Sequence, residues 1–231
     1  PRLDSVQRAM IDGIIETTFP GTNRTWEWLS RGGGRVDRLS VWIGSLSSKN
    51  SRRCLRVGRK KVIASIEGES SAAESITFQS AMDVPRGAWL SIVDPALFES
   101  GLQGSWLNSA VKSGTGSSWV RTEGRRPLLI HSDALSDDEN VQGFVVATGE
   151  IVQQRLRPPE LHTIDQVASS ISKKGIGKVT LRCRLDPEIH PTLQRRLDRE
   201  LKEVDGSRSF MVDMGVSRPS GTQTIYLVCK E

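Results

Sequence analysis

The sequence lacks several features that would assign a function directly. No run of its 231 residues approaches 18 apolar positions, which excludes a membrane-spanning helix. Aromatic residues make up only 5% of the chain and include six Trp but one Tyr. No metal-ligand spacing, nucleophile elbow or phosphate-binding loop is recognisable. We therefore expect no cofactor, and the sequence leaves enzyme activity undecided while favouring a non-enzymatic role.

Cysteine is also sparse. Cys54, Cys183 and Cys229 lie far apart and show no metal-binding spacing. Their odd number leaves at least one free thiol, so three reduced cysteines in strands of an intracellular protein are the simplest interpretation. The chain opens on Pro1-Arg2 without an apolar signal core. An intracellular location is therefore expected.

The charge balance is basic. Lys and Arg number 32 against 27 Asp and Glu, which gives a net charge of +5, and the isoelectric point is about 9.4. This balance favours nucleic acid or an anionic membrane surface as the partner. The alternative is an ordinary basic protein with a solvated surface. At this length the chain can bury a core in one large or two small domains.

Two helices are expected at the ends of the chain. Apolar residues at helical spacing predict a helix over residues 3–18, namely Leu3, Val6, Met10 and Ile14. A second helix is predicted to begin at Asp186-Pro187, because Asp caps helices and Pro suits their first turn. It carries an apolar stripe formed by Leu193, Leu197, Leu201 and Val204.

Between these helices, alternating apolar and polar residues predict about eight to ten short strands. The segments are residues 38–46, a hairpin over 52–66, 75–82, 87–93, 127–132, 143–152 and 178–185, and a terminal hairpin over 209–216 and 224–229. The alternation is typical of antiparallel sheets. The predicted fold is a β-rich α+β protein, an antiparallel β-sandwich or jelly-roll-like sheet with flanking helices at the N-terminus and before the last hairpin.

Three parts follow from this pattern. Residues 1–35 are expected to form an N-terminal helix and a joint that contains the glycines Gly32–Gly34. Residues 36–185 are expected to form the β-sandwich core. Residues 186–231 are expected to add a helix and a terminal β-hairpin packed on that core.

A basic hairpin is the densest cluster of charge. The stretch KNSRRCLRVGRKK holds no acid and seven cations: Lys49, Arg52, Arg53, Arg56, Arg59, Lys60 and Lys61. On one face of a hairpin these would form a positive ridge, with Trp42 as a nearby stacking surface, as in single-stranded nucleic-acid binding. The same cations suit an anionic membrane surface, and Lys and Arg also protect sheet edges from aggregation. Arg121, Arg125 and Arg126 form a second basic set before a predicted strand.

An acid closes one apolar strand in the stretch VPRGAWLSIVDPALFES. Pro95 stops strand pairing there, and the carboxylate of Asp94 is expected to accept neighbouring backbone N–H groups. The stretch resembles the signature of the thirty-kilodalton movement protein superfamily of plant viruses, in which a glycine precedes a short apolar strand that ends in an aspartate. Gly87 and Asp94 would be these two structural residues. Ala96 departs from the family, which often has a basic residue at that position.

The resemblance extends over residues 85–167 through the stretches GSWLNSAVK, IHSDA and ENVQGFVVATGEIV. It implies a β-sandwich related to viral jelly-roll proteins, sequence-independent binding to single-stranded nucleic acid, and traffic to membranes at plasmodesmata. The sequence does not decide between RNA and DNA, RNA is the favoured partner, and a place in the host cytoplasm is expected. We therefore expect a non-enzymatic viral protein that binds nucleic acid and forms homo-oligomers. The most specific version of this hypothesis is a movement protein. The alternatives are a viral matrix or capsid-like assembly protein on membrane or genome, and a hydrolase or transferase with a site of dispersed residues.

Overall fold

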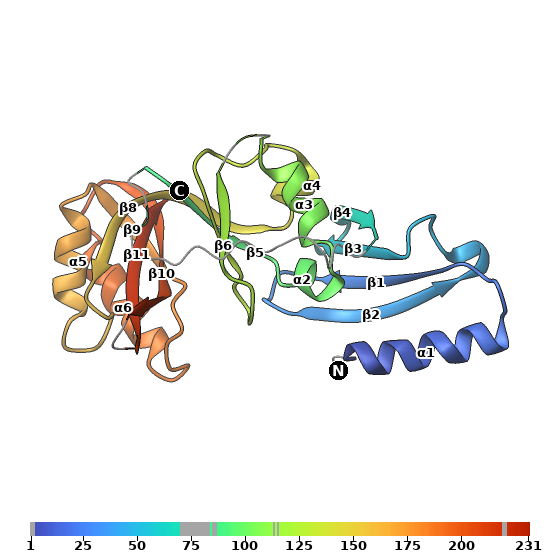
Figure 1. Cartoon of the computed structure of the whole chain (residues 1–231). Coiled ribbons are helices and arrows are strands. Elements are labelled where there is room, and N and C mark those ends of the chain that lie inside the picture. The colour runs from blue at the N-terminus through green and yellow to red at the C-terminus, as the bar shows by residue number, and fades with distance from the viewer. Residues whose placement is uncertain (1–2, 70–83, 85–86, 113, 115, 219–220) are drawn as a thin grey trace.

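The computed structural model describes residues 3–69, 84, 87–112, 114, 116–218 and 221–231. It is a mixed α+β fold with a four-stranded and a seven-stranded sheet and flanking helices (Figure 1). The predicted α+β class is confirmed, whereas the sandwich or jelly roll is not. Among the described residues, no helix has the length and apolar character that crossing a bilayer requires.

The four-stranded sheet occupies the N-terminal end of an elongated molecule (Figure 1). Its strands, in the order β2-β1-β3-β4, are β2 (Val36–Ile43), β1 (Arg24–Ser30), β3 (Arg52–Val57) and β4 (Val62–Gly68). The predicted hairpin over 52–66 is confirmed, because β3 and β4 pair antiparallel. β1 and β3 pair parallel after the chain returns through β2 and the turn Gly44–Leu46.

The seven-stranded sheet runs through the middle of the molecule to its C-terminal end. Its strands, in sheet order, are β6 (Ser117–Arg121), β7 (Leu128–His131), β5 (Trp89–Val93), β8 (Val145–Leu156), β11 (Gly221–Lys230), β10 (Ser207–Arg218) and β9 (Ile176–Leu181). The long strand β8 pairs with β5 through its first half and with β11 through its second. The terminal hairpin is confirmed as β10 and β11.

The prediction of antiparallel pairing throughout is wrong at two places, β1 with β3 and β9 with β10. Parallel neighbours need a crossover connection, and helix α6 (His190–Glu200) supplies it between β9 and β10. Leu193 and Leu197 of the predicted apolar stripe therefore belong to a crossover helix, which begins at His190 rather than at the predicted Asp186-Pro187, and Leu201 and Val204 follow its end. Leu193 and Leu197 are buried against the sheet.

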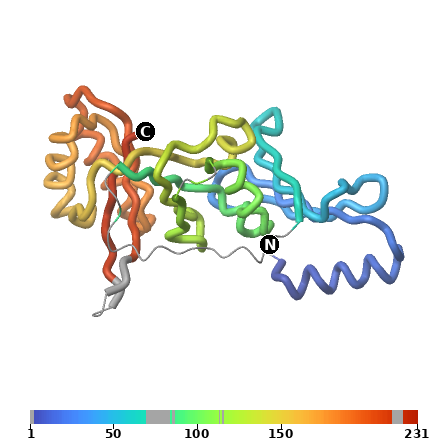
Figure 2. The backbone as a smooth tube through the Cα atoms, turned by 45° about the horizontal axis from the view of Figure 1, so that its top comes forward, coloured from blue at the N-terminus to red at the C-terminus, as the bar shows by residue number. Residues whose placement is uncertain are grey.

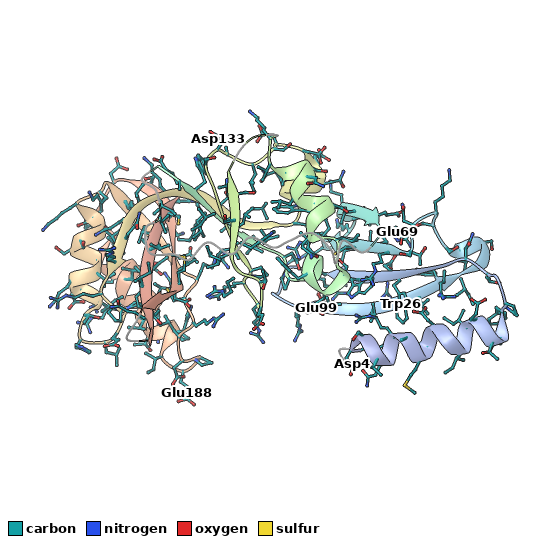
Figure 3. All side chains as sticks on the ribbon, viewed as in Figure 1. Asp4, Trp26, Glu69, Glu99, Asp133 and Glu188 are labelled. Atoms are coloured by element: carbon teal, nitrogen blue, oxygen red, sulfur yellow. The ribbon has the colours of Figure 1, made fainter. Side chains whose placement is uncertain are left out.

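The remaining helices cover the sheets. They are α1 (Ser5–Thr18), α2 (Ala96–Ser100), α3 (Gln103–Ala110), α4 (Glu139–Gln142) and α5 (Ile164–Ser172). α1 runs beside the four-stranded sheet, at the opposite end from α5 and α6 (Figure 2). Trp26 lies between that sheet and α1 (Figure 3), and its indole N–H donates to Asp12 at 3.1 Å.

The helix predicted over residues 3–18 is confirmed, but its apolar stripe faces outward. Val6, Met10 and Ile14 are 65–67% exposed. The inner face instead carries Ile11 and Ile15, which are offset from the stripe on the helix surface. Helical spacing therefore predicted the element, whereas three of its four apolar positions, Val6, Met10 and Ile14, do not face the sheet.

Residues 1–35, expected to hold only a helix and a glycine-rich joint, also contain β1, which pairs with β2 and β3. The three-part division of the chain itself stays a prediction. The strand predicted over residues 75–82 lies outside the described residues.

The seven-stranded sheet curls so that distant strands meet. β6 and β10 are separated by four strands in the sheet order, and neighbouring strands lie about 4.8 Å apart. Yet Arg121, at the end of β6, contacts Asp213 in β10 at 3.1 Å. The curl therefore brings the β6–β7 connection against the segment that follows β9.

Candidate anion-binding site

The seven cations of the basic hairpin do not form one ridge. Successive side chains of a strand point to opposite faces, so Arg53 leaves β3 on one face while Arg52 and Arg56 leave on the other. Arg53 forms ion pairs with Glu27 at 2.7 Å and with Glu67 at 3.5 Å. Its charge is therefore neutralised within the four-stranded sheet.

The inner arginines of β3 are also engaged. Arg52 donates to the Ser100 carbonyl at 2.6 Å, and its guanidinium lies 5.6 Å from the centroid of the Trp28 ring. Arg56 approaches the Asp94 carboxylate at 3.7 Å. The other cations, Lys49, Arg59, Lys60 and Lys61, are exposed. Trp42 lies in β2, which β1 separates from β3.

Asp94 is a buried structural carboxylate. It is 1% exposed and accepts from the Ser30 hydroxyl at 2.6 Å and from the Ala96 N–H at 3.0 Å. Burial raises its pKa, and these hydrogen bonds and the Arg56 charge oppose the rise. The Ala96 contact is the backbone N–H bond that the sequence predicts. Asp94 thus ties the end of β5 to β1 and β3 of the other sheet.

Two glycines are explained by this arrangement. A Cβ on Gly32 would come within 1.8 Å of the Arg56 guanidinium, so the glycine allows that side chain to reach Asp94. Gly87 has a φ of +77°, a left-handed conformation that favours glycine ahead of β5. Gly32 therefore makes room for a side chain, and Gly87 permits a backbone conformation.

A serine–histidine pair lies inside the seven-stranded sheet. The Ser91 hydroxyl bonds to Nε2 of His131 at 2.8 Å and to the Thr148 hydroxyl at 2.7 Å, and Nδ1 of His131 bonds to the Asp133 carbonyl. Ser91 is 0% exposed and His131 1%. A nucleophile must reach its substrate, so this pair is structural and does not support the hydrolase alternative.

The buried His131 predicts a pH dependence of stability. Burial lowers its pKa below the value of about 6.5 that it has in an unfolded chain. The unfolded chain therefore binds the proton first, and stability is lost as the pH falls from about 6.5 towards the lowered pKa. We predict that urea unfolding shows a smaller loss between about pH 7 and pH 5 for His131→Asn than for the wild type. His162→Asn, at a side chain 77% exposed, should keep the wild-type slope; equal slopes for all three proteins would contradict the prediction.

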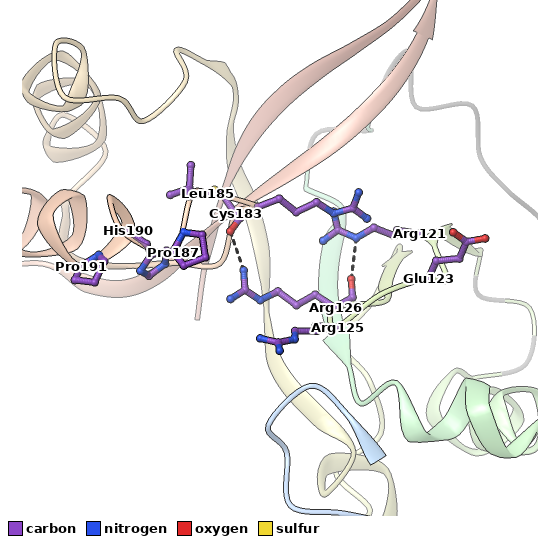
Figure 4. Close-up of a pocket in the computed structure, with 10 residues that line it drawn as sticks. Arg121, Glu123, Arg125, Arg126, Cys183, Leu185, Pro187, His190 and Pro191 are labelled. Carbon is purple, nitrogen blue, oxygen red and sulfur yellow. Dashed lines mark hydrogen bonds between the residues drawn. The ribbon is translucent and has the colours of Figure 1, made fainter. Parts of the chain in front are cut away.

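A cluster of arginines lies where the curled sheet closes. The β6–β7 connection and the segment between β9 and α6 face each other across a cavity of about 480 Å³ (Figure 4). The cavity is lined by Arg121, Glu123, Arg125, Arg126, Cys183, Arg184, Leu185, Pro187, His190 and Pro191. Most of its polar lining is arginine.

Arg121 is held rigidly in this cleft. Its side chain is 11% exposed, its Nε donates to the Arg126 carbonyl at 2.9 Å, and its Nη1 donates to the Asp213 carboxylate at 3.1 Å. Asp213 also accepts the backbone N–H of Arg184 at 2.7 Å. One carboxylate therefore fixes both walls of the cleft relative to each other.

The positive charge of the arginines in the cleft exceeds the negative charge of Asp213, the acid that pairs with them. Arg126 donates to the Cys183 carbonyl at 3.0 Å, and burial together with the neighbouring Arg182 and Arg125 lowers its pKa. Burial, Arg184 and Arg126 likewise lower the pKa of Arg121, while Asp213 opposes this. An anion in the cleft would relieve the repulsion among these groups.

Donor groups remain available to such an anion. Nη2 of Arg121, a residue that lines the cleft, is buried without a hydrogen-bond partner among the described residues. Arg125 and Arg184 are exposed on opposite walls. Glu123 points away from the guanidinium groups (Figure 4).

Within the described residues, no three His, Cys, Asp or Glu side chains gather into a cluster that could hold a metal ion. The cleft is instead built from nitrogen donors that carry positive charge. Its chemistry suits binding of a negatively charged group.

The sequence identified one half of this cleft. Arg121, Arg125 and Arg126 were recognised as a basic set, but as an addition to the hairpin. Arg184 was missed, because it lies about sixty residues further along the chain and only the curl of the sheet brings it near. The alternating arginines in the strand segment KVTLRCRL are the signal that could have found it.

No family model matches the chain, and no curated protein matches it. Among solved structures, the chain is similar to a "putative methyltransferase" from Porphyromonas gingivalis W83, with a TM-score of 0.48 and 14% sequence identity. The match covers 89% of this chain and 45% of that structure, so the chain spans less than half of its length. A likeness at this level supports no conclusion about function.

The prediction of a viral movement protein that binds single-stranded nucleic acid is wrong. The ridge on which the prediction depended is absent, since Arg53 and Arg56 contact carboxylates and Arg52 packs on Trp28. The viral assembly alternative depended on the same ridge and is withdrawn with it. No comparison tests the resemblance of residues 85–167 itself, and homo-oligomer formation and host location stay predictions.

Proposed function

We propose that the chain is a binding module for a compact phosphate-bearing ligand, held in the cleft between the β6–β7 connection and the segment after β9. One observation carries the proposal. Arg121, Arg125, Arg126 and Arg184 line a single cleft, and Asp213 is the one acid that contacts them among the ion pairs of the described residues.

Phosphate fits this cleft better than a carboxylate. Guanidinium groups bind tetrahedral oxyanions through paired N–H donors, and a doubly charged group compensates more of the excess charge. Arg121 and Arg126 are already fixed by bonds to backbone carbonyls, so little side-chain freedom is lost when an anion binds. Arg125 is exposed, and Arg184, 64% exposed, contacts Asp213 only at 3.9 Å, so both side chains can turn toward a ligand from opposite walls.

A calorimetric titration with pyrophosphate tests the proposal. Each hydrogen bond to a charged group contributes about 1.5–3 kcal/mol, so Arg125→Ala/Arg184→Ala should weaken binding by about 100-fold or more. Both side chains are exposed, so the variant should keep its fold. The matched control is Arg59→Ala/Lys60→Ala, which removes the same charge from the exposed β3–β4 turn.

The control variant is expected to stay within about twofold of the wild type. Equal losses in the two double variants would show that pyrophosphate responds to net charge alone. That result would overturn the proposal, as would a wild type that binds no pyrophosphate.

A further inference from the structure

A second cavity, of about 390 Å³, shares a wall with the arginine cleft. Arg121 and Arg184 line both cavities, and Asp213 lies in the wall between them. Each cavity has the size of a small-molecule pocket. A ligand that enters the arginine cleft therefore has a neighbouring space for a second group.

The second cavity differs from the first in its chemistry. Val120 gives it a partly exposed apolar side chain and Tyr226 an aromatic ring, whereas Leu128 and Met214 also border it but are almost fully buried. The half-buried Tyr226 lies directly across from Asp213 in the β10–β11 pairing. This places the ring beside the ion pair that closes the cleft.

The neighbouring positions leave room beside that ring. Gly215 pairs with Thr224 one step further along the same face of the hairpin, and both line the cavity. The glycine contributes no side chain there, while the Thr224 hydroxyl can donate or accept a hydrogen bond. The guanidinium of Arg184, 64% exposed, offers a second planar surface at the shared wall.

We propose that the ligand is a nucleoside monophosphate, with its phosphate in the arginine cleft and its base in the second cavity against Tyr226. The inference rests on the proposed function and adds the chemical class of the ligand. A base needs a planar stacking surface, an apolar side and a polar edge within reach of a phosphate site. Tyr226, Val120 and Thr224 provide these beside Arg121 and Arg184.

Calorimetry with AMP, ribose 5-phosphate and adenosine tests this inference. Stacking of a base on an aromatic side chain contributes about 1–3 kcal/mol, so AMP should bind about 5-fold to 100-fold more tightly than ribose 5-phosphate. Tyr226→Leu should bring AMP down to the level of ribose 5-phosphate. Tyr226→Phe, the matched control, keeps the ring and should keep the preference.

The outcomes separate the two proposals. Equal binding of AMP and ribose 5-phosphate, or an unchanged preference in Tyr226→Leu, overturns the nucleotide assignment and leaves the phosphate site standing. Adenosine that binds as tightly as AMP contradicts the role of the phosphate. If AMP, ribose 5-phosphate and pyrophosphate all fail to bind, both proposals are contradicted.

Discussion

Replacing Asp94 by alanine is expected to destabilise the protein by about 3–5 kcal/mol, because it leaves a buried charge without its partner. Arg56 approaches that carboxylate at 3.7 Å, and its Nη1 has no hydrogen-bond partner among the described residues. The Ser30 hydroxyl and the Ala96 N–H would lose their acceptor as well. Urea unfolding of Asp94→Ala measures the loss.

The raised pKa of Asp94 shows that burial of the carboxylate is itself unfavourable. The large effect of the substitution therefore comes from the groups left behind. Adding Arg56→Met to Asp94→Ala removes the unpaired charge and should recover part of the lost stability. Asp205→Ala, at an exposed position, should change the free energy of unfolding by less than about 0.5 kcal/mol. A loss in Asp94→Ala no larger than in Asp205→Ala would contradict this role of Asp94.

Asp213→Ala is expected to cost about 3 kcal/mol or more and to make stability depend on anions. Asp213 is the acid that pairs with Arg121, whose side chain is 11% exposed, and it also accepts the Arg184 N–H. Its removal leaves the cleft with more unneutralised charge. Phosphate should then raise the unfolding midpoint of the variant more than that of the wild type.

The affinity of phosphate for the folded variant sets how much of the lost stability its binding restores. A ligand at 100 times its dissociation constant stabilises the folded state by about 2.7 kcal/mol, which is close to the expected loss. Potassium chloride at matched ionic strength is the control, because screening alone cannot distinguish the cleft from the rest of the surface. Equal effects of phosphate and chloride on Asp213→Ala would contradict the anion site.

Local patterns in the sequence predicted elements but not their arrangement. The hairpins β3–β4 and β10–β11 and the helices α1 and α6 were found, because each is defined by neighbours in sequence. The parallel pairs β1–β3 and β9–β10 depend on where a crossover places a strand, which periodicity does not encode. The curl of the seven-stranded sheet is likewise a property of the packed fold.

For the candidate site, too, local clusters were predicted from the sequence but the contacts between distant segments were not. The hairpin cations were grouped because they are close in sequence, although alternation along β3 already separates Arg53 from Arg52 and Arg56. The carboxylates that bind these arginines, Glu27 and Asp94, lie on other strands. The arginine cleft needs residues from β6 and from the segment after β9, so neither half carries the signal alone.

Chemical-shift mapping of backbone amides during a pyrophosphate titration tests the location of the anion site most directly. The largest shifts are expected in residues 121–126 and 183–191, the two walls of the cleft. Shifts concentrated in residues 49–61, or spread evenly over the surface, would contradict the assignment.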